Sequence, residues 1–153
     1  MKRTFIIFFL LFTVSSVNAF DGNRKGFVFG GGGGINRTHN LNNNRTDPDI
    51  HYMIGYGFNE KNTLVLEGHN IIKLKDWDLI YGHGGIMWYH YYSNSTNSFY
   101  TVLGVRYIYE ANFNIGAGIL YHSNFQFGFV YHKDYEDDDW YQDWKLTVTY
   151  IGF

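Results

Sequence analysis

The sequence predicts an all-β fold in which eight antiparallel strands close into an up-and-down transmembrane β-barrel. Alternation is the first observation: residues 125–133 place Phe, Phe, Phe and Tyr at odd positions and Gln, Gly, Val and His at even positions. Composition is the second, since 153 residues contain 14 Tyr, 14 Phe, 18 Gly and one Pro. The chain has no cysteine, which excludes a disulfide-stapled domain and leaves closure of a sheet as the source of stability.

The first nineteen residues have the pattern of a secretory signal peptide. Lys2 and Arg3 precede the apolar run 5–14, and Val17, Asn18 and Ala19 form a small-residue cleavage site. This run is about ten residues, too short for a spanning helix. We expect Sec-type export, cleavage after Ala19, and a single mature domain of residues 20–153 in the cell outer membrane. The mature chain has no basic stripe, so nucleic acid is not an expected partner.

Each strand is predicted from alternating apolar residues bounded by turn residues. The expected strands are 25–35, 50–58, 63–72, 79–92, 99–109, 113–121, 125–133 and 140–153. The Asn-rich segment 36–49 and the acidic segment 134–139 are expected to be loops, and residues 59–62 and 93–97 tight turns. Residues 110–112 form an outer connection shorter than the inner turn 93–97, so either strands 99–109 and 113–121 extend beyond the membrane or these boundaries shift.

Five consecutive glycines, residues 30–34, interrupt the first strand. They permit a sharp bend or a close backbone approach. A phosphate-binding loop would need a following Lys-Ser/Thr pair and a helix, and the residues that follow are Ile35, Asn36, Arg37 and Thr38.

Alternation alone does not decide which row of side chains lies inside. A water-soluble barrel would hold the apolar row inside and expose the other row, which carries less charge than a soluble surface normally does. A closed sheet satisfies every backbone group in lipid, and a narrow eight-stranded interior suits small and polar residues. We therefore predict a lipid-facing row. Its members in the last two strands are Phe125, Phe127, Phe129, Tyr131, Trp144, Leu146, Val148 and Tyr150.

The opposite row carries the polar candidates for a lumen network. These are Glu67, His69, Arg106, His132 and Lys145. Two hypotheses remain: a structural network of ion pairs that fills the barrel, or a narrow pore for protons or small solutes. The first is favoured because buried charges must be paired and eight strands leave little room for water. The acidic segment 134–139 matches no calcium loop, so no metal or cofactor is predicted.

In several segments the chain resembles the small eight-stranded outer-membrane β-barrel proteins of Gram-negative bacteria. These are the signal peptide, the start 25–30, the segments 54–58, 98–101 and 115–118, and the terminal aromatic Phe153. The resemblance implies periplasmic termini, a lipid and lipopolysaccharide environment, delivery by periplasmic chaperones and the barrel-assembly machinery, a monomer, and a structural, adhesive or surface-interaction role. Phe153 is one residue out of phase with Tyr150 and Val148, and a bulge or bend at Gly152 would restore the phase.

A weaker resemblance concerns catalysis. The segment Tyr121, His122, Ser123, Asn124 is similar to the His-x-Ser-Asn motif of lipid A 3-O-deacylases, an outer-membrane family of the same fold. It implies His122 as the base, Ser123 as the nucleophile and Glu136 as the orienting acid of an acyl-ester hydrolase of lipid A or phospholipid. Adjacent residues on a strand point to opposite faces, so we interpret the segment as a polar turn and predict no enzyme.

Overall fold

The computed structural model describes residues 24–39, 44–73, 78–107, 111–136 and 139–153. The predicted signal peptide, residues 1–19, lies outside these ranges, as does the expected start of the mature domain at residue 20. No helix in the described ranges is long and apolar enough to span a lipid bilayer.

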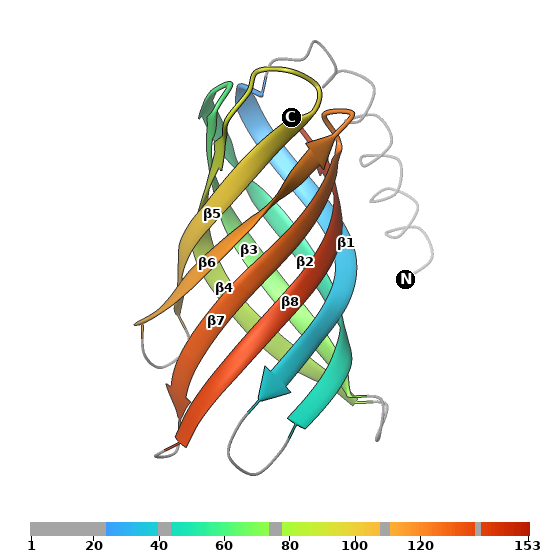
Figure 1. The fold of residues 1–153 in the computed structure, drawn as a ribbon, viewed down its shortest axis with the longest axis vertical. Coiled ribbons are helices and arrows are strands. Elements are labelled where there is room, and N and C mark those ends of the chain that lie inside the picture. Colours follow the sequence, from blue (N-terminus) through green and yellow to red (C-terminus); the bar gives the residue numbers. More distant parts are fainter. Residues whose placement is uncertain (1–23, 40–43, 74–77, 108–110, 137–138) are drawn as a thin grey trace, which may run out of the picture.

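Eight antiparallel strands form the whole described structure (Figure 1). They are β1 (Gly26–His39), β2 (Asn44–Asn59), β3 (Asn62–Lys73), β4 (Asp78–Tyr91), β5 (Ser98–Tyr107), β6 (Ala111–Tyr121), β7 (Phe125–Glu136) and β8 (Asp139–Gly152). Each strand pairs with its neighbours in the chain, and β1 pairs with β8, which closes the barrel. The predicted all-β, eight-stranded transmembrane barrel is confirmed.

Residues 36–39 and 44–49 of the polar segment belong to two paired strands, so the prediction of a loop was wrong there, and residues 40–43 lie outside the described ranges. β1 continues to His39 and β2 begins at Asn44, with a regular register from Gly34↔Asp49 to His39↔Asn44. Polar side chains indicate that a segment is in contact with water. They do not exclude strand pairing, because pairing satisfies backbone groups and does not depend on the polarity of the side chains. Pro48 is tolerated because the described β2–β3 register begins only at Asp49, so Pro48 has no partner on that side.

The acidic segment 134–139 gives a second correction of the same kind. β7 runs to Glu136 and β8 starts at Asp139, and these two residues pair. Strands that carry charged side chains beyond the apolar belt can still form backbone hydrogen bonds with each other. The boundaries near residue 110 also shift, since β5 ends at Tyr107 and β6 begins at Ala111.

The five glycines lie inside β1, in the part of the strand that pairs with β8. A Cβ on Gly32 would lie 2.1 Å from the Val148 carbonyl oxygen and 2.7 Å from the Thr149 Cα atom. A Cβ on Gly31 would meet only the His51 carbonyl oxygen, at 3.8 Å. The inward glycine is therefore required by a close backbone approach, one of the two roles expected for the run.

The outside of the barrel is apolar and half of its interior is polar, which excludes the water-soluble alternative. Every strand exposes large apolar side chains, from Phe27 on β1 to Val148 on β8. In the half nearer the C terminus the interior holds an apolar cluster. Its members are Val28, Met53, Val65, Met87, Tyr89, Tyr91, Tyr100, Val102, Leu120 and Ile151. The other half of the lumen holds buried polar and charged residues.

The two ends of the barrel differ. At the terminal end, which holds the C terminus, lie the short turns around residues 59–62, 92–97 and 122–124; the opposite end is called the loop end here (Figure 1). The β1–β8 register is unbroken up to Gly152, the residue before Phe153. No bulge at Gly152 therefore moves Phe153 onto the lipid-facing row of Tyr150 and Val148. Its ring instead packs edge-on against Tyr91 inside the barrel mouth, at 6.1 Å between ring centroids.

Candidate functional site: the polar lumen

The inner rows of four strands place the five predicted polar residues inside the barrel. Glu67 and His69 stand two residues apart on β3, while Arg106, His132 and Lys145 come from β5, β7 and β8. All five are buried, with His132 and Lys145 exposing 1% and 2% of their surface.

His69 bridges two carboxylates. Its Nδ1 atom lies 3.0 Å from Asp49 Oδ2, and its Nε2 atom lies 2.9 Å from Glu67 Oε1. A neutral imidazole carries only one N–H, so the bridge needs a second proton, on the ring or on one carboxyl group. The bridge therefore links two acids through one histidine in a water-poor interior.

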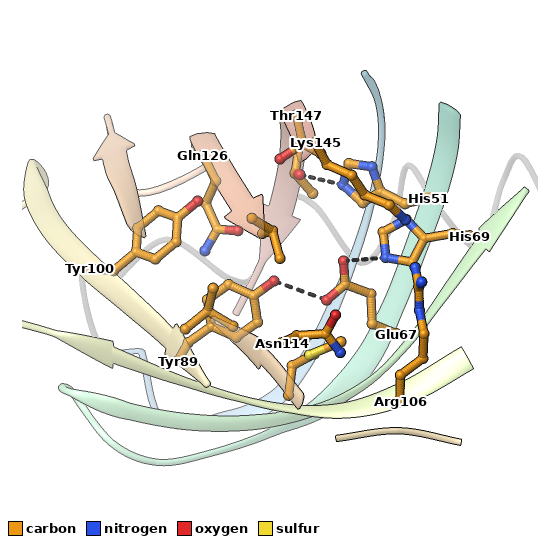
Figure 2. Close-up of a pocket in the computed structure, with 14 residues that line it drawn as sticks. His51, Glu67, His69, Tyr89, Tyr100, Arg106, Asn114, Gln126, Lys145 and Thr147 are labelled. Atoms are coloured by element: carbon orange, nitrogen blue, oxygen red, sulfur yellow. Dashed lines mark hydrogen bonds and ion pairs between the residues drawn. The ribbon is translucent and has the colours of Figure 1, made fainter. Parts of the chain in front are cut away.

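The ends of this bridge are held by further lumen residues (Figure 2). The Tyr89 hydroxyl donates to Glu67 Oε2 at 3.1 Å. Lys145 Nζ lies 3.8 Å from Asp49 Oδ2 on the other side. The result is a chain of contacts from β4 through β3 and β2 to β8, and it crosses the lumen.

A second ion pair lies in the same half of the lumen. Arg106 Nη1 is 3.9 Å from Asp143 Oδ2, which joins β5 to β8. Asp143 in turn pairs in register with His132 on β7. Of the five predicted residues, Glu67 and His69 are in direct contact, Lys145 reaches them through Asp49, and Arg106 pairs separately.

Sequence reasoning missed Asp49 and His51. Asp49 was assigned to a loop, although it stands two residues before His51 on the inner row of β2. His51 pairs in register with His69, and their rings lie 5.5 Å apart. The turn at 59–62 contained only part of the signal, because a regular hairpin about that turn places residue 51 opposite residue 70. The register shift between Gly57 and Asn59 moves the partner to residue 69.

A cavity of about 20 Å³ lies beside the network, lined by His51, Glu67, His69, Tyr89 and Lys145 among others (Figure 2). A water molecule needs about 10–15 Å³ measured in the same way, so this cavity holds roughly one. The cavity is therefore too small for a hydrated ion.

A different set of residues closes the terminal end. Gln126 Nε2 donates to the Tyr91 hydroxyl at 2.6 Å, and Arg24 lies against the same ring. Tyr91 and Gln126 are buried, at 0% and 1% exposure. Burial lowers the pKa of Arg24 from its ordinary value, while Tyr91 and Glu60 act in the opposite direction.

The three catalytic candidates are not brought together. His122 and Ser123 form the turn after β6, both with positive φ, and the exposed His122 ring packs on Tyr121 at 4.3 Å between centroids. The Ser123 backbone amide donates to the Thr96 carbonyl. Glu136 ends β7 at the far end of the barrel, about 40 Å along the strand from this turn. These positions provide no hydrolytic triad.

The predicted lipid-facing residues lie on the outer surface of β7 and β8. Phe125, Phe127 and Phe129 expose 43%, 48% and 39% of their surface. Trp144, Leu146 and Val148 are exposed as well, and Tyr131 and Tyr150 are half-buried. Tyr131 packs on the Trp144 ring at 4.4 Å.

Comparison with known proteins identifies the fold. No protein-family model matches the chain, and no curated protein matches its sequence. Among solved structures, neisserial surface protein A superposes with a TM-score of 0.61 at 11% identity, over 83% of this chain and 96% of that one. The N-terminal β-barrel domain of Pseudomonas aeruginosa OprF gives a TM-score of 0.49 at 14% identity, over 82% and 98%. Ail of Yersinia pestis gives 0.48 at 16% identity, over 83% and 99%. At these identities the likeness concerns the fold, and the chain has the fold of the small eight-stranded outer-membrane β-barrels.

Proposed function

We propose that this protein is a non-catalytic barrel of the outer membrane that holds its loop end at the cell surface, in a structural or adhesive role. One observation carries the proposal: the lumen is filled by a closed polar network while the outer surface is an apolar belt. A filled lumen suits an anchor better than a pore. The chain is expected to reach the membrane through periplasmic chaperones and the assembly machinery, and to function there as a monomer surrounded by lipid and lipopolysaccharide.

The dimensions of the belt support a membrane location. On β1 the outward apolar row runs from Phe27 to Ile35, about 27 Å along the strand. At a tilt of about 40° this covers about 20 Å of bilayer, close to the apolar band of known barrels. Beyond Ile35 the exposed side chains are polar, among them Arg37, His39 and Thr46.

The β1–β2 hairpin is the strongest candidate for a surface-presenting element. Its polar part extends beyond the belt by about four residue pairs, or roughly 13 Å of strand. Backbone pairing makes this part rigid, so a partner would meet a preformed polar ribbon.

Single cysteines can test the location and the orientation together, because the chain contains none. We expect a membrane-impermeant maleimide to label Thr46→Cys in intact cells. Asn94→Cys, an exposed position in the turn at the terminal end, is the matched control and should be labelled only after the cells are permeabilised. The reverse pattern, or recovery of the protein in a detergent-free soluble fraction, would contradict the proposal.

Two further measurements separate the anchor from its alternatives. Lipid A extracted from overexpressing cells should have an unchanged mass spectrum, since no hydrolytic triad is formed. The protein in planar bilayers should show no steady conductance. A new deacylated species abolished by Ser123→Ala, or an open channel, would replace the proposal by an enzyme or a pore.

A further inference from the structure

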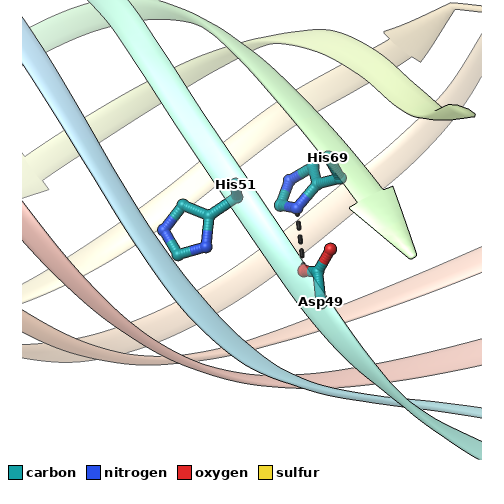
Figure 3. Close-up of side chains that lie close together, drawn as sticks. All are labelled: Asp49, His51 and His69. Atoms are coloured by element: carbon teal, nitrogen blue, oxygen red, sulfur yellow. Dashed lines mark hydrogen bonds and ion pairs between the residues drawn. The ribbon is translucent and has the colours of Figure 1, made fainter. Parts of the chain in front are cut away.

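We propose that Asp49, His51 and His69 form a binding site for a divalent transition-metal ion in the loop-end half of the lumen. One ligand atom from each residue lies within 4.8 Å of the other two, and all three residues are buried (Figure 3). Two imidazoles and one carboxylate are a donor set suited to Zn²⁺, Fe²⁺, Ni²⁺ or Cu²⁺.

Each histidine has its Nε2 atom held by another side chain, and the Nδ1 atom is the one that would bind the metal. His51 Nε2 is hydrogen-bonded to Thr149 Oγ1, and His51 Nδ1 has no hydrogen-bond partner although the residue is only 2% exposed. His69 Nε2 is held by Glu67, and its Nδ1 atom faces Asp49. In Figure 3 both rings turn a nitrogen toward the Asp49 carboxylate.

The surroundings match the outer shell of a metal site. Metal-binding histidines usually donate their other N–H to a carboxylate, which fixes the ring and raises its basicity. Glu67 stands in that position on His69, and the Tyr89 hydroxyl holds Glu67 in turn. Such a second layer is unnecessary for a simple ion pair, and it orients His69 for a ligand on the opposite nitrogen.

The Asp49 carboxylate can accept the ion in exchange for its contact with His69. Asp49 Oδ1 is buried without a hydrogen-bond partner, and Oδ2 contacts His69 Nδ1. Ligand atoms around tetrahedral zinc lie about 3.3 Å apart. His69 Nδ1 and Asp49 Oδ2 are already 3.0 Å apart, and the remaining separations, none above 4.8 Å, would close by at most about 1.5 Å. The ion would take the place of the proton between His69 and Asp49, so binding releases that proton.

Lys145 is the competing cation. Its Nζ atom lies 3.8 Å from Asp49 Oδ2 and is itself without a hydrogen-bond partner. A positive charge at this distance repels a bound ion, so Lys145 sets how tightly the site holds a metal. Removing this charge should therefore strengthen binding, which a purely structural ion-pair network does not predict.

The test uses untagged protein purified from membranes, stripped with a chelator and dialysed against excess zinc chloride. Zinc per barrel is measured by mass spectrometry, only on protein whose electrophoretic mobility shifts on heating. We expect one zinc ion in the wild type, affinity weakened at least about tenfold in His51→Gln, and affinity raised about tenfold in Lys145→Met. His132→Gln removes a lumen histidine outside the cluster and should bind as the wild type does.

A cobalt titration gives a second readout that does not depend on stoichiometry. Co²⁺ bound to two imidazoles and a carboxylate should produce a visible absorption spectrum, which Asp49→Asn and His51→Gln should abolish. The proposal is overturned if the wild type retains no zinc, if His51→Gln binds equally well, or if His132→Gln loses the ion too.

Discussion

Arg24 lies over the face of the Tyr91 ring, with its guanidinium carbon 4.6 Å from the ring centroid. The same guanidinium donates two hydrogen bonds of 2.6 Å, from Nη2 to the backbone carbonyls of Ser93 and Ser95. Arg24, two residues before β1, thus holds the β4–β5 turn and covers the terminal end of the lumen.

Replacing Arg24 should loosen this end. Arg24→Met loses the ring contact and both charge-assisted hydrogen bonds, and we expect the free energy of unfolding to fall by about 2–3 kcal/mol. Arg24→Lys keeps the charge without the planar fork and should recover about half of that loss. Urea unfolding in lipid vesicles measures both, and equal stability of Arg24→Met and the wild type would show that the contact is dispensable.

Two neighbouring glycines should respond differently to the same substitution. Gly32→Ala places a methyl group against the Val148 carbonyl oxygen, and backbone must move to admit it. We expect a loss of about 1–3 kcal/mol or a failure to fold. Gly31→Ala, which meets only ordinary contacts on the outer side, should fold normally. Heat-modifiable mobility and urea unfolding compare the pair, and similar behaviour would contradict the close approach of β1 and β8.

The hydrogen bond between Tyr89 and Glu67 should couple the two residues energetically. Tyr89→Phe should cost about 1–2 kcal/mol because it leaves a buried carboxylate with one donor fewer. Glu67→Met should cost about 3 kcal/mol because His69 and Tyr89 lose their shared acceptor. The double variant should cost about 1 kcal/mol less than the sum. Tyr100→Phe, a buried tyrosine with no described hydrogen bond to Glu67, is the control, and additive losses would refute the coupling.

A charged side chain on the outer surface should lower the stability of the barrel strongly in the middle of the apolar belt and only weakly at its edge. Phe129→Arg, two positions beyond Phe127 on the outer row of β7, should destabilise the barrel in a bilayer by about 2–4 kcal/mol. Tyr121→Arg, at the end of β6 beside the terminal turn, should cost about 0–1 kcal/mol. Unfolding measured in lipid vesicles separates the two, and equal costs would mean that the belt is misplaced.

The alternation of apolar and polar residues predicted the strands and their two rows of side chains. It could do so because successive side chains of any strand point to opposite faces of the sheet. The loop at 36–49 was mispredicted because Asn, Asp and Thr were taken to indicate turns, although a paired ribbon in water tolerates them. The contact between Lys145 and Asp49 was out of reach. It joins β8 to β2 over the intervening β1, and it depends on the register with which β1 and β8 close the barrel. The pairing of His51 with His69 was also out of reach, because a register shift between Gly57 and Asn59 moves it one residue from that of a regular hairpin.

The glycines of β1 lie where the chain joins its own two ends. β1 meets β8 along a register from Phe29↔Gly152 to His39↔Gln142, so the pairing that completes the barrel joins residues more than a hundred positions apart. At five consecutive positions β1 contributes no side chain to its pairing with β8. There β1 is held only by backbone hydrogen bonds and by the neighbouring strands. Gly30, Gly32 and Gly34 face the lumen, so only Gly31 and Gly33 leave backbone uncovered on the outer face. At these two positions acyl chains take the place of protein side chains on the strand that completes the barrel.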